Sequence, residues 1–106
     1  MPKYLVKASY SAEGTRGLLK DGGSGRMNAI EGLINSVGGS VEAFYYAFGD
    51  DDLIWICDLP SHSDAIAMSL AVNAARGARV TTTPLLTLDE IDDGVKKAVS
   101  YRPPGA

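Results

Sequence analysis

The stretch SVEAFYYAFGDDDLIWICDL, residues Ser40 to Leu59, decides the fold that the sequence predicts. Its two runs, 41–48 and 53–59, are rich in the β-branched and aromatic residues that favour strands. The connection Gly-Asp-Asp-Asp, 49–52, is short and contains residue types typical of tight turns. The pattern therefore predicts an antiparallel hairpin, and the density of aromatic side chains indicates that it lies at the centre of a sheet.

Residues 3–10, KYLVKASY, alternate like a strand with two unequal faces. One face carries Tyr4, Val6, Ala8 and Tyr10, and the other, more polar face carries Lys3, Leu5, Lys7 and Ser9. Ser11 is suited to cap a short helical piece that ends at the breaker Asp21-Gly22-Gly23. A second helical piece runs from Arg26 to Val37, and Gly38-Gly39 can adopt positive φ at its end.

The second half of the chain contains two capping-box motifs. Ser61-His62-Ser63-Asp64 opens a helix that runs to about Arg76. Residues 78–83, ARVTTT, form a strand limited by Pro84, a residue that is tolerated at a sheet edge. Thr87-Leu88-Asp89-Glu90 opens a last helix.

The resulting order is βαββαβ plus a terminal helix, in a single domain of residues 1–106 with an extended, Pro-containing tail at 100–106. Right-handed crossovers place both main helices on one face of a four-stranded antiparallel sheet, which is the α+β, ferredoxin-like plait. Helices can cover only one sheet face, yet the hairpin strands carry large apolar side chains on both. We therefore expect a second copy of the chain to cover the other face in a homodimer.

Composition narrows the classes of partner. The formal net charge is −3 and no cluster of Lys or Arg occurs, so the basic surface that binds nucleic acid or an anionic membrane is missing. No run approaches the ~18 apolar residues of a membrane span, and no signal-peptide pattern occurs. The single cysteine, Cys57, lies in an apolar strand, which fits a buried thiol in a reducing compartment. We expect a cytoplasmic protein with neither a nucleic-acid nor a membrane partner.

A set of aromatic and basic strand residues is a candidate binding site: Tyr4, Lys7, Tyr10, Tyr46 and Trp55. Alternate strand positions can converge on the concave space between a sheet and its helices, where a small apolar or aromatic ligand would bind. Ordinary core packing and dimer contacts are the competing interpretation, because a one-residue slip in register exchanges the two faces.

Three further features have both a functional and a structural interpretation. His62, the only histidine, is a candidate general base with Tyr46 as a second catalytic candidate, or else an exposed residue in the first turn of a helix. Gly22-Gly23-Ser24-Gly25-Arg26 could present backbone N–H groups and a guanidinium to an anion, or act as a flexible joint. Asp50-Asp51-Asp52 lacks the ligand spacing of a calcium loop, so we predict a solvated turn, no metal and no cofactor.

Several segments together resemble the GYD domain family: MPKYLVKASYS at 1–11, the Val37-Gly38-Gly39 helix end, FYYAFG at 44–49 leading to Asp52, and TTPLLT at 82–87. The resemblance covers nearly the whole chain. It implies a ferredoxin-like fold of the dimeric α/β-barrel type and no established activity. Asp51 stands where the family's Gly-Tyr-Asp signature has an aromatic residue, so a role of that tyrosine does not carry over.

Three functions fit these observations. The first is a small-molecule-binding homodimer of the α/β-barrel type, with ligand-binding residues Lys7, Tyr10, Tyr46, Trp55 and His62. The second, by fold analogy, is a cofactor-independent monooxygenase or isomerase. The third is a structural or regulatory assembly module whose sheet face and tail dock partners. A polar-lined cavity with Tyr46 or His62 pointing inward favours the first two functions, and a filled core favours the third.

Overall fold

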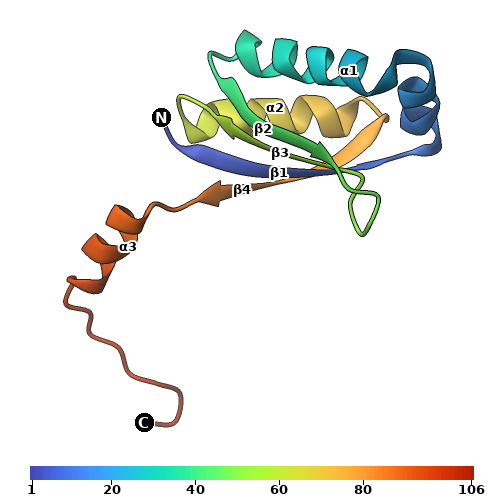
Figure 1. The fold of residues 1–106 in the computed structure, drawn as a ribbon. Helices are drawn as coiled ribbons and strands as arrows, with labels where there is room; N and C mark the ends of the chain where they lie inside the picture. Colours follow the sequence, from blue (N-terminus) through green and yellow to red (C-terminus); the bar gives the residue numbers. More distant parts are fainter.

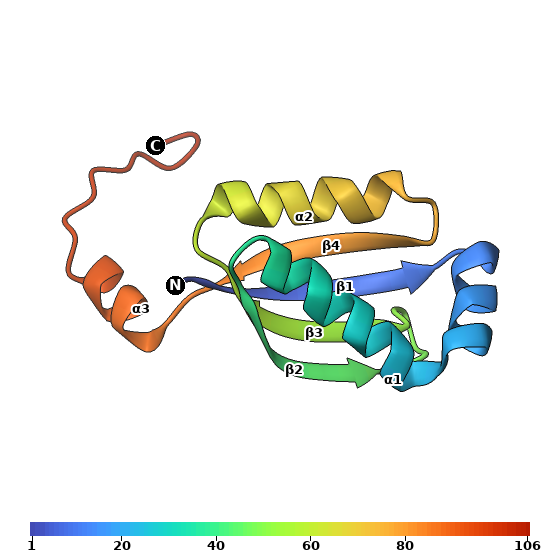
Figure 2. The ribbon, with the colours of Figure 1, turned by 90° about the horizontal axis from the view of Figure 1, so that it is seen from above.

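The computed structural model describes all 106 residues (Figure 1). In chain order its elements are β1 (Lys3–Tyr10), α1 (Ala12–Ser36), β2 (Ser40–Tyr46), β3 (Leu53–Asp58), α2 (His62–Ala74), β4 (Ala78–Leu85) and α3 (Leu88–Val95). The strands form one antiparallel sheet in the order β2-β3-β1-β4. Figure 2, seen from above, shows α1 and α2 lying over one face of this sheet, while α3 stands apart. The predicted ferredoxin-like plait with an extra C-terminal helix is confirmed.

The three predicted helix starts are confirmed by their hydrogen bonds. The side-chain oxygens of Ser11 and Ser61 each accept the backbone N–H three residues further on, at 3.1 and 3.4 Å. Thr87 and Glu90 form a complete capping box, in which each side chain accepts the other residue's backbone N–H. These contacts are local, since they involve residues three apart, which is why the sequence reveals them.

A kink divides α1 into the two helical pieces that the sequence predicts. Gly22 has φ 75° and ψ 170°, outside the helical region and on the positive-φ side that glycine tolerates. Figure 2 shows the first piece of α1 turned away from the direction of the second. Only the second piece lies along the sheet, where Ile30 and Ile34 are buried.

Alternate strand residues build the core together with one face of each covering helix. The fully or nearly fully buried residues are Tyr4, Val6, Ala8, Ile30, Ile34, Leu53, Trp55, Cys57, Leu59, Ala65, Met68 and Val80. Burying a large apolar side chain stabilises the fold by roughly 1.5–3 kcal/mol. Tyr4, Val6 and Ala8 form the predicted inward face of β1, so the alternation read from the sequence is confirmed.

The hairpin is shorter than the sequence predicts. β2 ends at Tyr46, not at Phe48, because the Ala47 N–H already bonds the Asp52 carbonyl at 3.0 Å and starts the turn. Phe48 itself has φ 51° and is 66% exposed. One of the aromatic residues that led to the strand prediction, Phe48, therefore lies in the turn beyond β2.

The fourth strand is longer than predicted, because β4 continues through Pro84 to Leu85. β1 is the only neighbour of β4, so Pro84 lies in an edge strand, where a missing N–H is tolerated. α2 ends at Ala74, two residues before the predicted limit, and Arg76 takes the positive φ of 65° that follows.

The other face of the sheet is open, since no helix lies over it (Figure 1). Its strand residues alternate with those of the core. Lys3 anchors one end of this open face, because its Nζ donates to carboxylate oxygens of Glu42 and Asp58, both at 2.9 Å. Tyr45 on β2 is 71% exposed.

The chain after β4 leaves the body of the molecule (Figure 1). No residue of α3 is buried, and the apolar side chains of Leu88 and Val95 are exposed. Residues 100–106, the predicted tail, contain neither helix nor strand. None of the helices has the combination of length and apolar character that a bilayer crossing requires.

Candidate functional site

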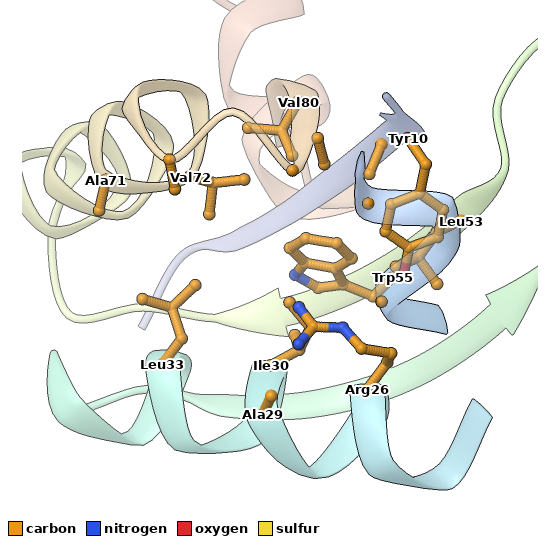
Figure 3. Close-up of a pocket in the computed structure, with 16 residues that line it drawn as sticks. Tyr10, Arg26, Ala29, Ile30, Leu33, Leu53, Trp55, Ala71, Val72 and Val80 are labelled. Atoms are coloured by element: carbon orange, nitrogen blue, oxygen red, sulfur yellow. The ribbon is translucent and has the colours of Figure 1, made fainter. Parts of the chain in front are cut away.

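A cavity of about 390 Å³ lies between the sheet and the two covering helices (Figure 3). Twelve of its 16 lining residues are hydrophobic. The lining consists of Ala8, Tyr10, Gly14, Gly17, Arg26, Ala29, Ile30, Leu33, Leu53, Trp55, Ala71, Val72, Ala75, Gly77, Ala78 and Val80. This volume lies in the range of small-molecule sites, about 300–1,000 Å³.

Small residues leave this space open. α1 contributes Gly14 and Gly17, α2 contributes Ala71, and Gly77 follows α2. Gly14 lies so close to the segment after α2 that an added Cβ would be 1.8 Å from the carbonyl oxygen of Gly77. A larger side chain at Gly14 would therefore collide with the backbone of Gly77, whereas an added Cβ at Gly17 would have no atom within 4 Å.

Three side chains supply the polar groups of the cavity: Tyr10 from β1, Trp55 from β3 and Arg26 from α1. The Arg26 side chain is 32% exposed, and its nearest carboxylate is a long 3.7 Å away on Asp21. Figure 3 shows Arg26 extending from α1 on the side of the cavity where the Trp55 indole lies. Arg26 is therefore the one cationic group at this site, and it is only weakly paired.

Trp55 is 1% exposed, and its Nε1 has no hydrogen-bond partner. The Cys57 thiol lies on the same face of β3 and is also buried. Burial raises the pKa of the Cys57 thiol to about 11, and the indole N–H partly offsets that rise. An unpaired buried donor destabilises a protein by about 1–3 kcal/mol, so burial of this indole N–H is unfavourable for folding.

Tyr46 lies beside the cavity without lining it. Its hydroxyl donates to the Gly23 carbonyl at 3.1 Å and so joins β2 to the kink of α1. Burial raises the pKa of the Tyr46 phenol, the Tyr10 phenol raises it further, and the Arg26 guanidinium lowers it in part. The phenol is therefore protonated at neutral pH, and it acts as a hydrogen-bond donor that holds the helix joint.

A separate, open groove of about 370 Å³ runs between α2 and β4. Its lining consists of Tyr4, His62, Ala65, Ile66, Ser69, Leu70, Thr82 and Pro84. The Tyr4 hydroxyl and His62 Nδ1 are hydrogen-bonded at 2.5 Å. Burial raises the pKa of Tyr4, so the phenol keeps its proton at neutral pH. The tautomer of the His62 ring decides whether the hydroxyl donates to Nδ1 or accepts from it.

Two of the three aspartates of the hairpin turn contact the end of β1. Asp52 Oδ2 accepts the Tyr10 backbone N–H at 2.8 Å, and the Ser9 hydroxyl donates to Asp51 at 3.4 Å. These bonds hold the turn against the strand that carries Tyr10. No group of three or more His, Cys, Asp and Glu side chains is placed to hold a metal ion.

The structure brings only part of the predicted ligand set together. Tyr10 and Trp55 line the cavity, and Tyr46 lies next to it. His62 lies in the separate groove with Tyr4. Lys7 is exposed on the open face, opposite the cavity, because it alternates with Ala8 and Tyr10 along β1.

Sequence reasoning missed the helical half of the lining and the role of the small residues. Ile30 and Leu33 showed the spacing of core residues, and the same spacing fits a cavity wall. One signal was present: the glycine-rich segment that ends in Arg26 was a candidate anion site, and Arg26 is the charged residue of the cavity. Its partners on β1 and β3 could not be identified without the fold.

A single antiparallel sheet covered on one face by two helices defines the class of the protein as ferredoxin-like α+β. Within that class the chain belongs to the GYD domain family, whose model matches residues 4–95. The match runs from β1 to the end of α3, so it confirms the resemblance seen in the sequence. Searches of curated proteins and of solved structures gave no match.

Proposed function

We propose that this GYD domain binds a small molecule in the cavity between the sheet and the helices, and that it does so as a homodimer. The observation that carries the binding proposal is the cavity itself, about 390 Å³ with a mainly apolar lining and a few donor groups at its wall. Pockets of this size and composition are the default ligand sites of proteins. Tyr10 and Trp55 are the ligand contacts that the sequence had indicated.

The chemistry of the lining supports binding over acid–base catalysis. Arg26 and Tyr10 are the only titratable residues that line the cavity, and its lining contains no His, Asp, Glu, Lys or Cys. Tyr46, which lies beside the cavity, keeps its proton because burial raises its pKa. His62 lies in the other groove, where its Nδ1 is occupied by Tyr4. A cofactor-independent monooxygenase or isomerase would need a base that this cavity does not offer.

The homodimer part of the proposal rests on the open face of the sheet. Leu5, Ile54 and Ile56 lie at its centre and are only half covered, and Tyr45 is exposed beside them. Lys3 closes one end of this apolar region with its two carboxylate partners. A second copy, packed sheet to sheet, would remove this surface from water, which stabilises association.

A matched pair of α2 variants tests the binding proposal. Ala71 lines the cavity, whereas Ala67, one turn earlier, lines neither cavity nor groove, and both side chains are exposed. The neutral probe 3-cyclohexylpropanamide should change the fluorescence of Trp55, the only tryptophan, in the wild type and in Ala67→Phe. Ala71→Phe should abolish the response. A filled core that takes no probe would instead support the assembly-module interpretation.

A further inference from the structure

The polar groups of the cavity have one chemical property in common. Arg26 and Tyr10 can both donate a hydrogen bond, and no Asp, Glu, Asn or Gln lines the space. A cationic ligand would find no counter-charge there. A ligand with a negative charge or strong acceptors would find a guanidinium that is held to Asp21 only across 3.7 Å.

The number of charges limits the ligand further. Arg26 is the only Lys or Arg among the 16 lining residues, so the site offers a single full positive charge. A guanidinium matches a carboxylate in geometry, since two parallel N–H donors meet two oxygens. A dianion would bury a second negative charge against an apolar wall, which is unfavourable.

The cavity volume limits the size of the apolar body. A cavity of ~150 Å³ holds benzene, with its six non-hydrogen atoms, so one of about 390 Å³ holds roughly 15. The wall that faces this body consists of Ile30, Leu33, Val72 and Val80. Aliphatic and aromatic groups both suit such a wall.

Resting on the proposed binding function, we propose that the natural ligand is an amphipathic monocarboxylate whose apolar body fills the cavity and whose carboxylate pairs with the Arg26 guanidinium. The Tyr10 hydroxyl is the second donor available to the carboxylate. The Trp55 indole forms the wall beside the carboxylate. Its Nε1 is covered by neighbouring atoms and meets the ligand only when those side chains shift.

Three probes of one shape test this inference: 3-cyclohexylpropanoate, the neutral 3-cyclohexylpropanamide and the cationic 3-cyclohexylpropylamine. None absorbs where tryptophan is excited, so the fluorescence of Trp55 reports binding to the full-length protein directly. The carboxylate should bind at least tenfold more tightly than the amide, and the amine most weakly. Arg26→Met should remove the carboxylate's advantage over the amide, and a cooperative thermal unfolding transition shows that the variant is folded.

Arg16→Met is the matched control, since Arg16 is an exposed residue of the same helix that does not line the cavity. It should keep the preference for the carboxylate. Equal affinity for carboxylate and amide in the wild type would overturn the inference and leave the binding function intact. A preference that survives Arg26→Met would overturn the assignment of Arg26. Binding of no probe would overturn the proposed function and this inference together.

Discussion

The two faces of the sheet are built from the same four strands and differ in how deeply their side chains are buried. The helix-covered face carries Trp55 and Val6, which are buried to within 1% of full coverage. The open face carries Ile54 and Lys7, their chain neighbours, which are half-buried and exposed. Each pair of neighbours belongs to one strand, so the position of the covering helices decides which of the two residues becomes core.

This difference indicates which face suits ligand binding and which face suits association with another protein. The covered face encloses a cavity between the sheet, α1 and α2. Neither this cavity nor the groove beside α2 lies on the open face, whose mixture of apolar side chains and ion-paired Lys3 suits contact with another protein surface. Four comparisons between variants test the contrast between the two faces.

The largest change in the free energy of unfolding is expected for Trp55, and Ile54 on the other face of the same strand is its control. Trp55→Ala should lower the free energy of unfolding by about 3–5 kcal/mol, because it removes the largest buried side chain. Ile54→Ala should lower it by only about 1 kcal/mol in dilute solution, since Ile54 is half-buried. Urea denaturation measures both. Equal losses at every protein concentration would show that the two faces do not differ as described.

A second pair of variants tests how tightly the covered face is closed. Gly14→Ala should destabilise the fold by about 3 kcal/mol, since its Cβ would lie 1.8 Å from the Gly77 carbonyl oxygen and force α1 away. Gly32→Ala lies in the same helix with no atom within 4 Å of the added Cβ. It should stabilise the fold by about 0.5–1 kcal/mol through helix propensity. Thermal unfolding measures both, and a tolerated Gly14→Ala would contradict the close contact.

The buried Cys57 on the covered face makes the free energy of unfolding depend on pH. Burial raises the pKa of its thiol from 9.0 to about 11, so the folded state holds this proton more tightly than the unfolded chain. Its contribution to stability, about 2 kcal/mol, is complete below pH 9 and disappears as the pH rises through 11. The free energy of unfolding should fall across this window. Cys57→Ala, which has no thiol, should show a shallower fall, and parallel curves would contradict the shift.

The smallest effect on folding is expected on the open face. Tyr45→Lys changes a residue that is 71% exposed, so the free energy of unfolding of one chain should stay within about 0.5 kcal/mol. In the proposed dimer the new ammonium would be buried between two sheets. Light scattering should show the mass of two chains for the wild type and of one for the variant. Leu19→Lys, at an exposed position of α1, is the control that should remain dimeric.

Local interactions explain what could be predicted about the fold. Ser11, Ser61 and Thr87 cap helices through hydrogen bonds to residues three positions away, so their sequence context is sufficient. The alternation of residues 3–10 likewise places Tyr4 and Lys7 on opposite faces without knowledge of the partner strands. That same alternation separates Lys7 from Tyr10, and it argues against grouping them in one site.

The cavity could not be predicted to the same extent. It depends on β1, β3, α1 and α2 meeting around a space, and sequence periodicity marks its walls as ordinary core. The signals that were present, Tyr10, Trp55 and the glycine-rich segment before Arg26, indicated residues of the cavity lining one at a time. Their convergence depends on the crossing of helices over the sheet.

The sequence by itself determined the element order, the helix caps and the inward face of the first strand, because these depend on residues close together in the chain. The tertiary structure alone decided that Arg26 faces Tyr10 and Trp55 across one cavity and that His62 joins Tyr4 in another groove. Contacts between residues far apart in the chain depend on register and helix packing, and small residues such as Gly14 set how closely those elements approach. The hairpin of residues 40–59 thus identifies the fold, and the packing of two helices over it creates the site.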